Sequence, residues 1–326
     1  MLVCVIGCTG YLGSKISSRL HNKGHKVIGV CRKFPKNNKK FKNNFYKIIE
    51  GDITKPTFQN KIFKNLFSAI VYTVSLNHKN SEVNLNNSIR VNYLPLLNIC
   101  NIISKKKLKT KIIYFSTMQV YGNYNKEKII SEKTKKNCKN IYALTHSMCE
   151  DILEIYSNFG NITHTSLRLS NGYGYPELKT CDCWWLVVND FCLNVEKKNR
   201  IILNSDGSPL RDFIHISDIA NSVEKLLTIK KKLPKIMNLC SGKTTSMLEI
   251  AAIVKKKSSK INKKPDLYLK DEKLSEKDLS KKISILKNKQ KFRIDNSEMK
   301  KFKLIPEINL SKGIEKTLID LKKKKN

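Results

Sequence analysis

Leu2-Val-Cys-Val-Ile6 followed by Gly7-Cys-Thr-Gly10-Tyr-Leu-Gly13 is the stretch that decides the fold of this 326-residue chain. The apolar run predicts a buried strand, and the glycines let the backbone turn sharply into a helix expected from about residue 11 to 20. The first turn of such a helix presents free N–H groups and the positive end of its dipole. The pyrophosphate of a dinucleotide is the anion that this arrangement receives, so the residues predicted to hold a cofactor are Gly7, Gly10, Tyr11, Leu12 and Gly13. An ordinary strand-to-helix connection is the alternative.

The rest of the N-terminal half alternates strands with helices. Strands are expected over residues 26–31, 46–49, 69–74, 111–115 and 163–169, and helices over 89–103 and 142–156. This alternation predicts an α/β fold with a Rossmann-type doubly wound parallel sheet. We expect residues 1–170 to form the dinucleotide-binding domain, with segment 212–240 returning to it, and residues 171–326 to form a smaller C-terminal α/β substrate-binding region.

The charge of the chain limits the classes of function. A net charge of +36 suggests nucleic-acid binding. Only seven of the 63 basic residues are Arg, however, and the lysines occur in surface-like runs such as 105–107 and 255–257, without interleaved aromatic residues on which bases could stack. We therefore expect solvated lysine faces and no specific nucleic-acid partner, and a nucleic-acid-associated protein is the least favoured interpretation.

The distribution of apolar residues and cysteines predicts a cytoplasmic protein without membrane contact. No apolar run approaches the roughly 20 residues of a membrane span, and the first residues lack the pattern of a signal peptide. The ten cysteines are scattered, which indicates reduced thiols. Cys181 and Cys183 have no second Cys or His pair at zinc spacing, so no metal site is expected.

Six motifs follow one another along the chain. They are Gly-x-x-Gly-x-x-Gly at 7–13, Gly-Asp-Ile at 51–53, Ser-Thr-Met-Gln-Val-Tyr-Gly at 116–122, Leu-Arg-Leu-Ser-Asn-Gly-Tyr-Gly at 167–174, Arg-Asp-Phe-Ile-His-Ile-Ser-Asp at 211–218 and Asn-Leu-Cys-Ser-Gly at 238–242. With them, the sequence resembles the extended short-chain dehydrogenase/reductase family, the nucleotide-sugar epimerases and dehydratases. The resemblance implies an NAD(P)-dependent enzyme that acts on a nucleotide-diphosphate sugar by hydride transfer and forms a homodimer.

The same resemblance assigns ligand contacts outside the glycine turn. Asp52 would accept a hydrogen bond from the adenine amino group while Ile53 packs on the ring, and a turn aspartate is the alternative interpretation. Asn171 and Arg211 would contact the diphosphate of the substrate, because a guanidinium fork suits that group.

The residues after the second predicted strand favour NADP(H) over NAD(H). NAD enzymes of this kind carry an acidic residue about 20 positions beyond the last glycine, where it holds the adenosine ribose. Here Cys31 is followed by Arg32 and Lys33. Cations suit a 2′-phosphate, so Arg32 is predicted to bind it. The alternative is that both cations belong to the solvated lysine-rich background.

The resemblance implies a reaction centre with a Tyr acid/base, a Lys four residues later and a Thr that contacts the reacting oxygen. Thr117 precedes Tyr142 by 25 positions, a spacing typical of the family, but His146 stands where the lysine is expected. Literal Tyr-x-x-x-Lys matches begin at residues 11, 124 and 175, and none has a suitable position. We hypothesise Tyr142, Thr117 and His146 as the catalytic set. A catalytically weakened NADP(H)-binding protein with an interaction or regulatory role is the alternative.

The residues after Thr117 bear on the type of reaction. The family's dehydratases carry Asp-Glu there, which supply the acid and base for loss of water, whereas this chain carries Met118 and Gln119. Neither side chain can transfer a proton. Epimerisation, or reduction of a keto sugar, is therefore expected rather than dehydration.

Overall fold

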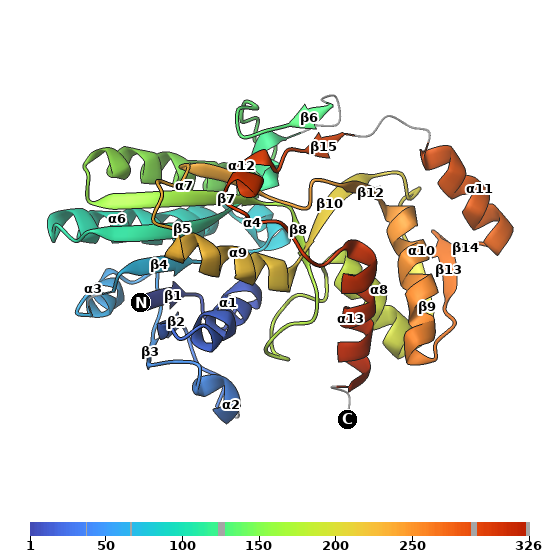
Figure 1. Cartoon of the computed structure of the whole chain (residues 1–326), viewed down its shortest axis with the longest axis horizontal. Helices are drawn as coiled ribbons and strands as arrows, with labels where there is room; N and C mark the ends of the chain where they lie inside the picture. Colours follow the sequence, from blue (N-terminus) through green and yellow to red (C-terminus); the bar gives the residue numbers. More distant parts are fainter. Residues whose placement is uncertain (37, 66, 123–127, 288–291, 324–326) are drawn as a thin grey trace.

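The computed structural model describes residues 1–36, 38–65, 67–122, 128–287 and 292–323, so Tyr124 of the rejected motif lies outside the described residues. Within them, a parallel seven-stranded sheet has the order β11-β7-β5-β4-β1-β2-β3 (Figure 1). Its strands are β1 (Leu2–Ile6), β2 (Lys26–Cys31), β3 (Lys47–Glu50), β4 (Ala69–Tyr72), β5 (Thr110–Thr117), β7 (Ile162–Leu169) and β11 (Ile236–Leu239). The predicted doubly wound sheet is confirmed.

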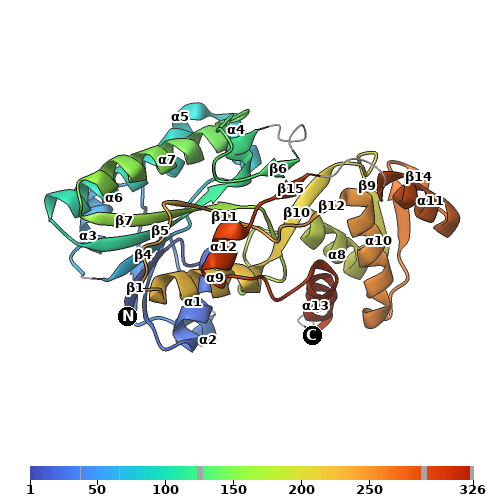
Figure 2. The ribbon, with the colours of Figure 1, turned by 45° about the horizontal axis from the view of Figure 1, so that its top comes forward.

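Helices cover both faces of this sheet (Figure 2), which is why its strands are continuous apolar runs. One face packs on α1 (Tyr11–Asn22) and α9 (Ile216–Thr228), and the other on α3 (Pro56–Ile62), α6 (Leu94–Lys105) and α7 (Ile141–Asn158). The chain runs from β1 outward to β3 and then returns to place β4 on the other side of β1. A crevice at the carboxyl ends of the strands, between β1 and β4, is where such sheets bind ligands.

The helix expected from residue 89 begins differently. A π-helix, η1 (Ile89–Tyr93), precedes α6. Pro95 occupies the first turn of α6 and has no N–H to donate, so the preceding backbone widens by one residue. Short helices lie around these layers: α2 (Lys39–Lys42), α4 (His78–Val83), α5 (Leu85–Ser88), η2 (Met118–Tyr121) and α12 (Ser297–Lys301).

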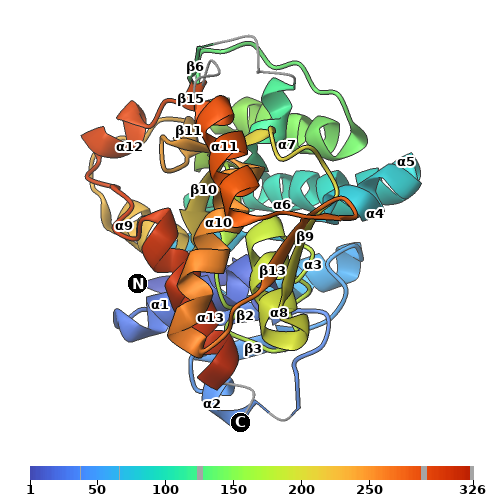
Figure 3. The ribbon, with the colours of Figure 1, turned by 90° about the vertical axis from the view of Figure 1, so that its right-hand side faces the viewer.

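The remaining elements form a smaller region beside the sheet (Figure 3). Many of them share an apolar core of their own, and β6 and β15 contribute to a further small cluster. Two three-stranded sheets, β12-β10-β8 and β14-β13-β9, belong to this region, and β6 pairs with β15. The strands are β6 (Ile129–Ile130), β8 (Asn171–Tyr173), β9 (Arg200–Leu203), β10 (Leu210–His215), β12 (Thr244–Ser246), β13 (Asp266–Leu269), β14 (Glu272–Lys273) and β15 (Arg293–Ile294). The helices are α8 (Val187–Lys198), α10 (Met247–Lys257), η4 (Ser258–Ile261), α11 (Glu276–Lys287) and α13 (Leu310–Lys323).

Candidate active site

The glycine turn joins β1 to α1 at the carboxyl edge of the sheet. Gly7 has φ +92°, and a Cβ on Gly13 would lie 2.1 Å from the carbonyl oxygen of Gly7. The N–H of Gly10 donates to that same oxygen at 2.9 Å, and the N–H of Cys8 donates to the carbonyl of Val30. The turn therefore leaves no room for side chains at Gly7 and Gly13. The free N–H groups at the N-terminus of α1 can donate hydrogen bonds to a dinucleotide pyrophosphate bound there.

Replacing Gly13 with alanine is expected to reduce dinucleotide binding below detection, because the added methyl group would have to occupy the space of the Gly7 carbonyl. Fluorescence titration with NADPH measures this. Gly24→Ala, just beyond the other end of α1, is the matched control: its Cβ meets nothing within 4 Å, so only the cost of its φ of +78° applies. Gly13→Ala binding NADPH as well as Gly24→Ala does would contradict the assigned role of the turn.

The neighbouring strand ends carry the predicted adenosine contacts. Arg32 is exposed directly after β2, and Ile53 is buried after β3. One oxygen of Asp52 accepts hydrogen bonds from the N–H and the hydroxyl of Thr54, both at 2.9 Å, and these bonds lower the pKa of Asp52. Asp52 therefore does stabilise this turn. A carboxylate can accept more than two hydrogen bonds, so Asp52 can still accept one from an adenine amino group.

Thr117 and Tyr142 come together from different elements. Thr117 ends β5, and Tyr142 lies in the first turn of α7. Asn140 caps α7 by accepting a bond from the N–H of Ala143 at 2.8 Å, and its amide donates to Gln119, which ties the helix start to the segment after Thr117. Burial raises the pKa of Tyr142 to about 12, opposed by a hydrogen bond with Thr117. At neutral pH the phenol is therefore protonated.

His146 lies one turn further along α7 and is 3 % exposed. Its ring meets that of Tyr142 edge-on, with centroids 4.5 Å apart. Its Nδ1 lies 2.6 Å from the hydroxyl of Tyr114, and its Nε2 lies 3.3 Å from the hydroxyl of Ser75. Burial lowers the pKa of His146 to about 4, so the imidazole is neutral at pH 7. Both nitrogens thus have protein partners, and the residue supplies no positive charge to Tyr142.

A buried ion pair joins α7 to strand β7 of the sheet. Glu150 of α7 receives two hydrogen bonds from the Arg168 guanidinium, at 2.9 and 2.7 Å, and one from the Ser116 hydroxyl at 2.6 Å. The guanidinium also lies over the ring of Tyr121, 4.7 Å from its centroid. Sequence reasoning missed Glu150 and Tyr114, because no local pattern marks them.

The predicted substrate residues lie on the β8–β10 pair. The Asn171 amide donates to the carbonyl of Asp212 at 2.8 Å, and Arg211 is exposed, with one donor on the carbonyl of Leu210 at 3.1 Å. Asp212 is buried and accepts bonds from Ser241 and Lys243. The Tyr11 hydroxyl donates to the carbonyl of Gly174 at 2.8 Å, so this region joins the glycine turn directly.

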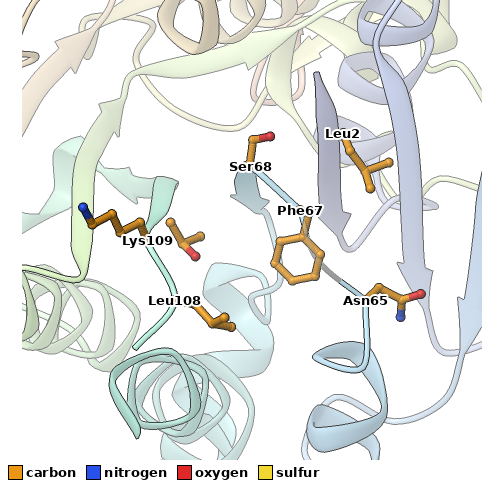
Figure 4. Close-up of a pocket in the computed structure, with 7 residues that line it drawn as sticks. Leu2, Asn65, Phe67, Ser68, Leu108 and Lys109 are labelled. Carbon is orange, nitrogen blue, oxygen red and sulfur yellow. The ribbon is translucent and has the colours of Figure 1, made fainter. Parts of the chain in front are cut away.

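A surface cavity lies at the opposite edge of the sheet. Its volume is about 340 Å³, and Figure 4 shows side chains that line it, including Leu2, Asn65, Phe67, Ser68, Leu108 and Lys109. Leu2, Ser68 and Thr110 lie at the amino ends of β1, β4 and β5, so this cavity is not part of the candidate site.

Two further properties concern the described residues only. They contain no group of three or more His, Cys, Asp or Glu side chains that could hold a metal ion, and the Cys181 thiol instead contacts the carbonyl of Thr9 and the hydroxyl of Ser14. None of the helices in this part of the chain combines the length and apolar character needed to cross a membrane.

Comparison with known proteins identifies the family of this chain. Residues 3–240 match the model of the NAD dependent epimerase/dehydratase family. The chain belongs to this family. A member of the family has a nicotinamide dinucleotide site, and the predictions of the extended short-chain dehydrogenase/reductase family and of an enzyme are thereby confirmed.

Individual relatives are distant. A putative UDP-glucose 4-epimerase of Methanocaldococcus jannaschii is 27% identical over 255 residues, which cover 78% of this chain and 81% of the relative. The UDP-glucose 4-epimerase of Mycoplasma genitalium is 26% identical over 279 residues, covering 78% and 80%. Among solved structures, UDP-glucose 4-epimerase with UDP-glucose from Thermotoga maritima superposes with a TM-score of 0.82 at 20% sequence identity. MoeE5 in complex with UDP-glucose and NAD superposes with a TM-score of 0.81 at 16% identity. Each match covers 100% of both chains.

Proposed function

We propose that this family member is an NADP(H)-dependent epimerase or reductase of a nucleotide-diphosphate sugar. The observation that carries the proposal is that Thr117 lies close enough to Tyr142 to lower the pKa of its phenol against the effect of burial, at the same sheet edge as the glycine turn. Relatives named for UDP-sugar epimerisation make UDP-linked sugars the first candidates.

The pair can handle a sugar hydroxyl or carbonyl. The Tyr142 phenol would exchange a proton with the reacting oxygen, and the Thr117 hydroxyl would hold that oxygen by a hydrogen bond. A bound nicotinamide would supply hydride-transfer chemistry at the neighbouring carbon. Met118 is buried after Thr117 and Gln119 is engaged by Asn140, so neither offers the acid or base that elimination of water needs.

Turnover assays with purified protein test the proposal. UDP-glucose, UDP-glucuronic acid and UDP-linked keto sugars are supplied with NADPH or NADP⁺, and interconversion is followed by chromatography and absorbance. Conversion of at least one sugar is expected. Tight dinucleotide binding without any conversion would instead favour the weakened binding protein, an outcome made physically reasonable by the neutral His146.

The preference for NADP(H) rests on Arg32, which is exposed at the carboxyl end of β2. Arg32→Ala is expected to weaken NADPH binding about 10- to 100-fold, because a charge-assisted hydrogen bond to the 2′-phosphate is lost. NADH lacks that phosphate and serves as the internal control, so its affinity should stay unchanged. Equal effects on both dinucleotides would refute the assignment.

We further propose that the protein is a cytoplasmic homodimer. Four large apolar side chains are exposed on or just beside α6 and α7: Leu94, Leu144, Ile155 and Phe159, with exposed fractions of 40%, 44%, 50% and 62%. Burying such a surface against a second copy would remove it from water. The ten cysteines are free thiols, as a reducing compartment favours. Light scattering after size-exclusion chromatography measures the oligomeric state.

A further inference from the structure

The segment that leaves the carboxyl end of β4 connects the glycine turn to the helix of Tyr142. The Thr73 hydroxyl donates to the carbonyl of Ile6 at 2.9 Å, directly before Gly7. Two residues further on, the Ser75 hydroxyl lies 3.3 Å from Nε2 of His146. A dinucleotide whose pyrophosphate lies at the turn and whose nicotinamide reaches Tyr142 has to pass along this segment.

The hydrogen-bond partners define the direction of each bond around Ser75. Its hydroxyl donates to the carbonyl of Leu76 at 2.8 Å, so it accepts from the Nε2–H of His146. The remaining nitrogen, Nδ1, then accepts from the Tyr114 hydroxyl at 2.6 Å. This assignment places the single proton of the ring on Nε2, and it is compatible with the neutral imidazole that the low pKa of His146 requires. A serine oxygen has two lone pairs, so one of them stays available at half-buried Ser75.

The backbone of the segment is held from a second side. Asn92, buried in the π-helix η1, accepts a hydrogen bond from the N–H of Leu76 at 2.7 Å and donates to the Thr145 hydroxyl of α7 at 3.1 Å. His146 therefore fixes the Ser75 side chain while Asn92 fixes the adjoining backbone. A π-turn that positions one buried polar residue is typical of a functional site.

Given the proposed function, on which this inference rests, we propose that Ser75 is a further cofactor-binding residue: its hydroxyl accepts a hydrogen bond from a ribose hydroxyl on the nicotinamide half of the dinucleotide. His146 and Tyr114 are positioning residues that hold the Ser75 hydroxyl in place. Ser75, His146 and Tyr114 thus form a neutral hydrogen-bonded network around the position where the family resemblance implies a lysine, and none of the three supplies a positive charge.

Binding of two probes to the complete protein tests this assignment. NADPH carries the nicotinamide ribose, whereas adenosine 2′,5′-bisphosphate lacks it. Ser75→Ala, His146→Ala and Tyr114→Phe are each expected to weaken NADPH about three- to tenfold, the effect of one hydrogen bond, and to leave the truncated probe unchanged. Because His146 acts through Ser75, the double variant Ser75→Ala/His146→Ala should bind NADPH only slightly more weakly than Ser75→Ala alone.

Two variants serve as controls. Tyr72→Phe removes the hydroxyl of the neighbouring tyrosine, which is buried and has no hydrogen-bond partner among the described residues, so NADPH binding should not change. Ser75→Thr keeps the hydroxyl and should retain most of the affinity. Unchanged NADPH binding in Ser75→Ala, or equal losses for both probes, would overturn the assignment. The readout needs no turnover: a protein that shows this pattern but converts no sugar contradicts the proposed reaction and supports Ser75.

Discussion

Replacing Tyr142 with phenylalanine is expected to lower turnover of the sugar substrate about 100- to 10,000-fold, the contribution of a positioned acid or base. The ring is retained, so its edge-on contacts with His146 and His78 should persist. NADPH affinity should therefore stay near that of the unmodified protein. The loss should appear in the turnover number rather than in the Michaelis constant, and steady-state kinetics separate the two.

Tyr156→Phe provides a matched control, since it removes the same hydroxyl from the same helix, where that group donates to Asn101 at the surface. Its turnover should be unchanged. A Tyr142→Phe protein as active as Tyr156→Phe would exclude Tyr142 as the acid/base.

The raised pKa of Tyr142 gives this prediction a pH dependence. With a pKa of about 12, the phenol donates a proton readily at neutral pH but is deprotonated only in a small fraction of molecules. Oxidation of a sugar alcohol, which needs the phenolate, should therefore accelerate about tenfold per pH unit above neutrality, while carbonyl reduction should stay nearly level. His146→Lys places a cation beside the phenol, lowers its pKa and should shift the rise to lower pH. An oxidation rate that is already constant around pH 7 would contradict this account.

Glu150→Gln is expected to reduce the free energy of unfolding by about 3–5 kcal/mol, because it leaves the Arg168 guanidinium buried without its countercharge. Both side chains of this pair are only 2% exposed. The pair joins α7 to β7, so its loss also loosens the helix that carries Tyr142. Denaturant unfolding followed by circular dichroism measures the change.

Asp151→Asn is the natural comparison, because Asp151 is the next residue of α7 and pairs with Lys136 at the surface, where its side chain is 63% exposed. Its loss should cost at most about 1 kcal/mol. Equal losses in the free energy of unfolding would show that the buried Glu150–Arg168 pair contributes no more to stability than the exposed Asp151–Lys136 pair.

Much of the fold is local in origin and could be predicted. Apolar runs such as Leu2–Ile6 form the buried strands, and the Gly7 and Gly13 positions require a residue without a side chain. The helix predicted from residue 89 begins as a π-helix instead, since the effect of Pro95 on the preceding turn depends on how that turn is packed. The small paired strands of the C-terminal half carry no periodic signal strong enough to predict.

By itself, the sequence determined the sheet, the glycine turn and the family, because each depends on apolar runs and motifs that single stretches of chain carry. The pairing of Thr117 with Tyr142 was expected only from the family resemblance. Only the tertiary structure decided where the nitrogens of His146 lie and which residues hold α7. Those contacts join Ser75, Tyr114 and Arg168 from three different strands or strand ends, and the direction of a side chain is set by packing between segments distant in sequence.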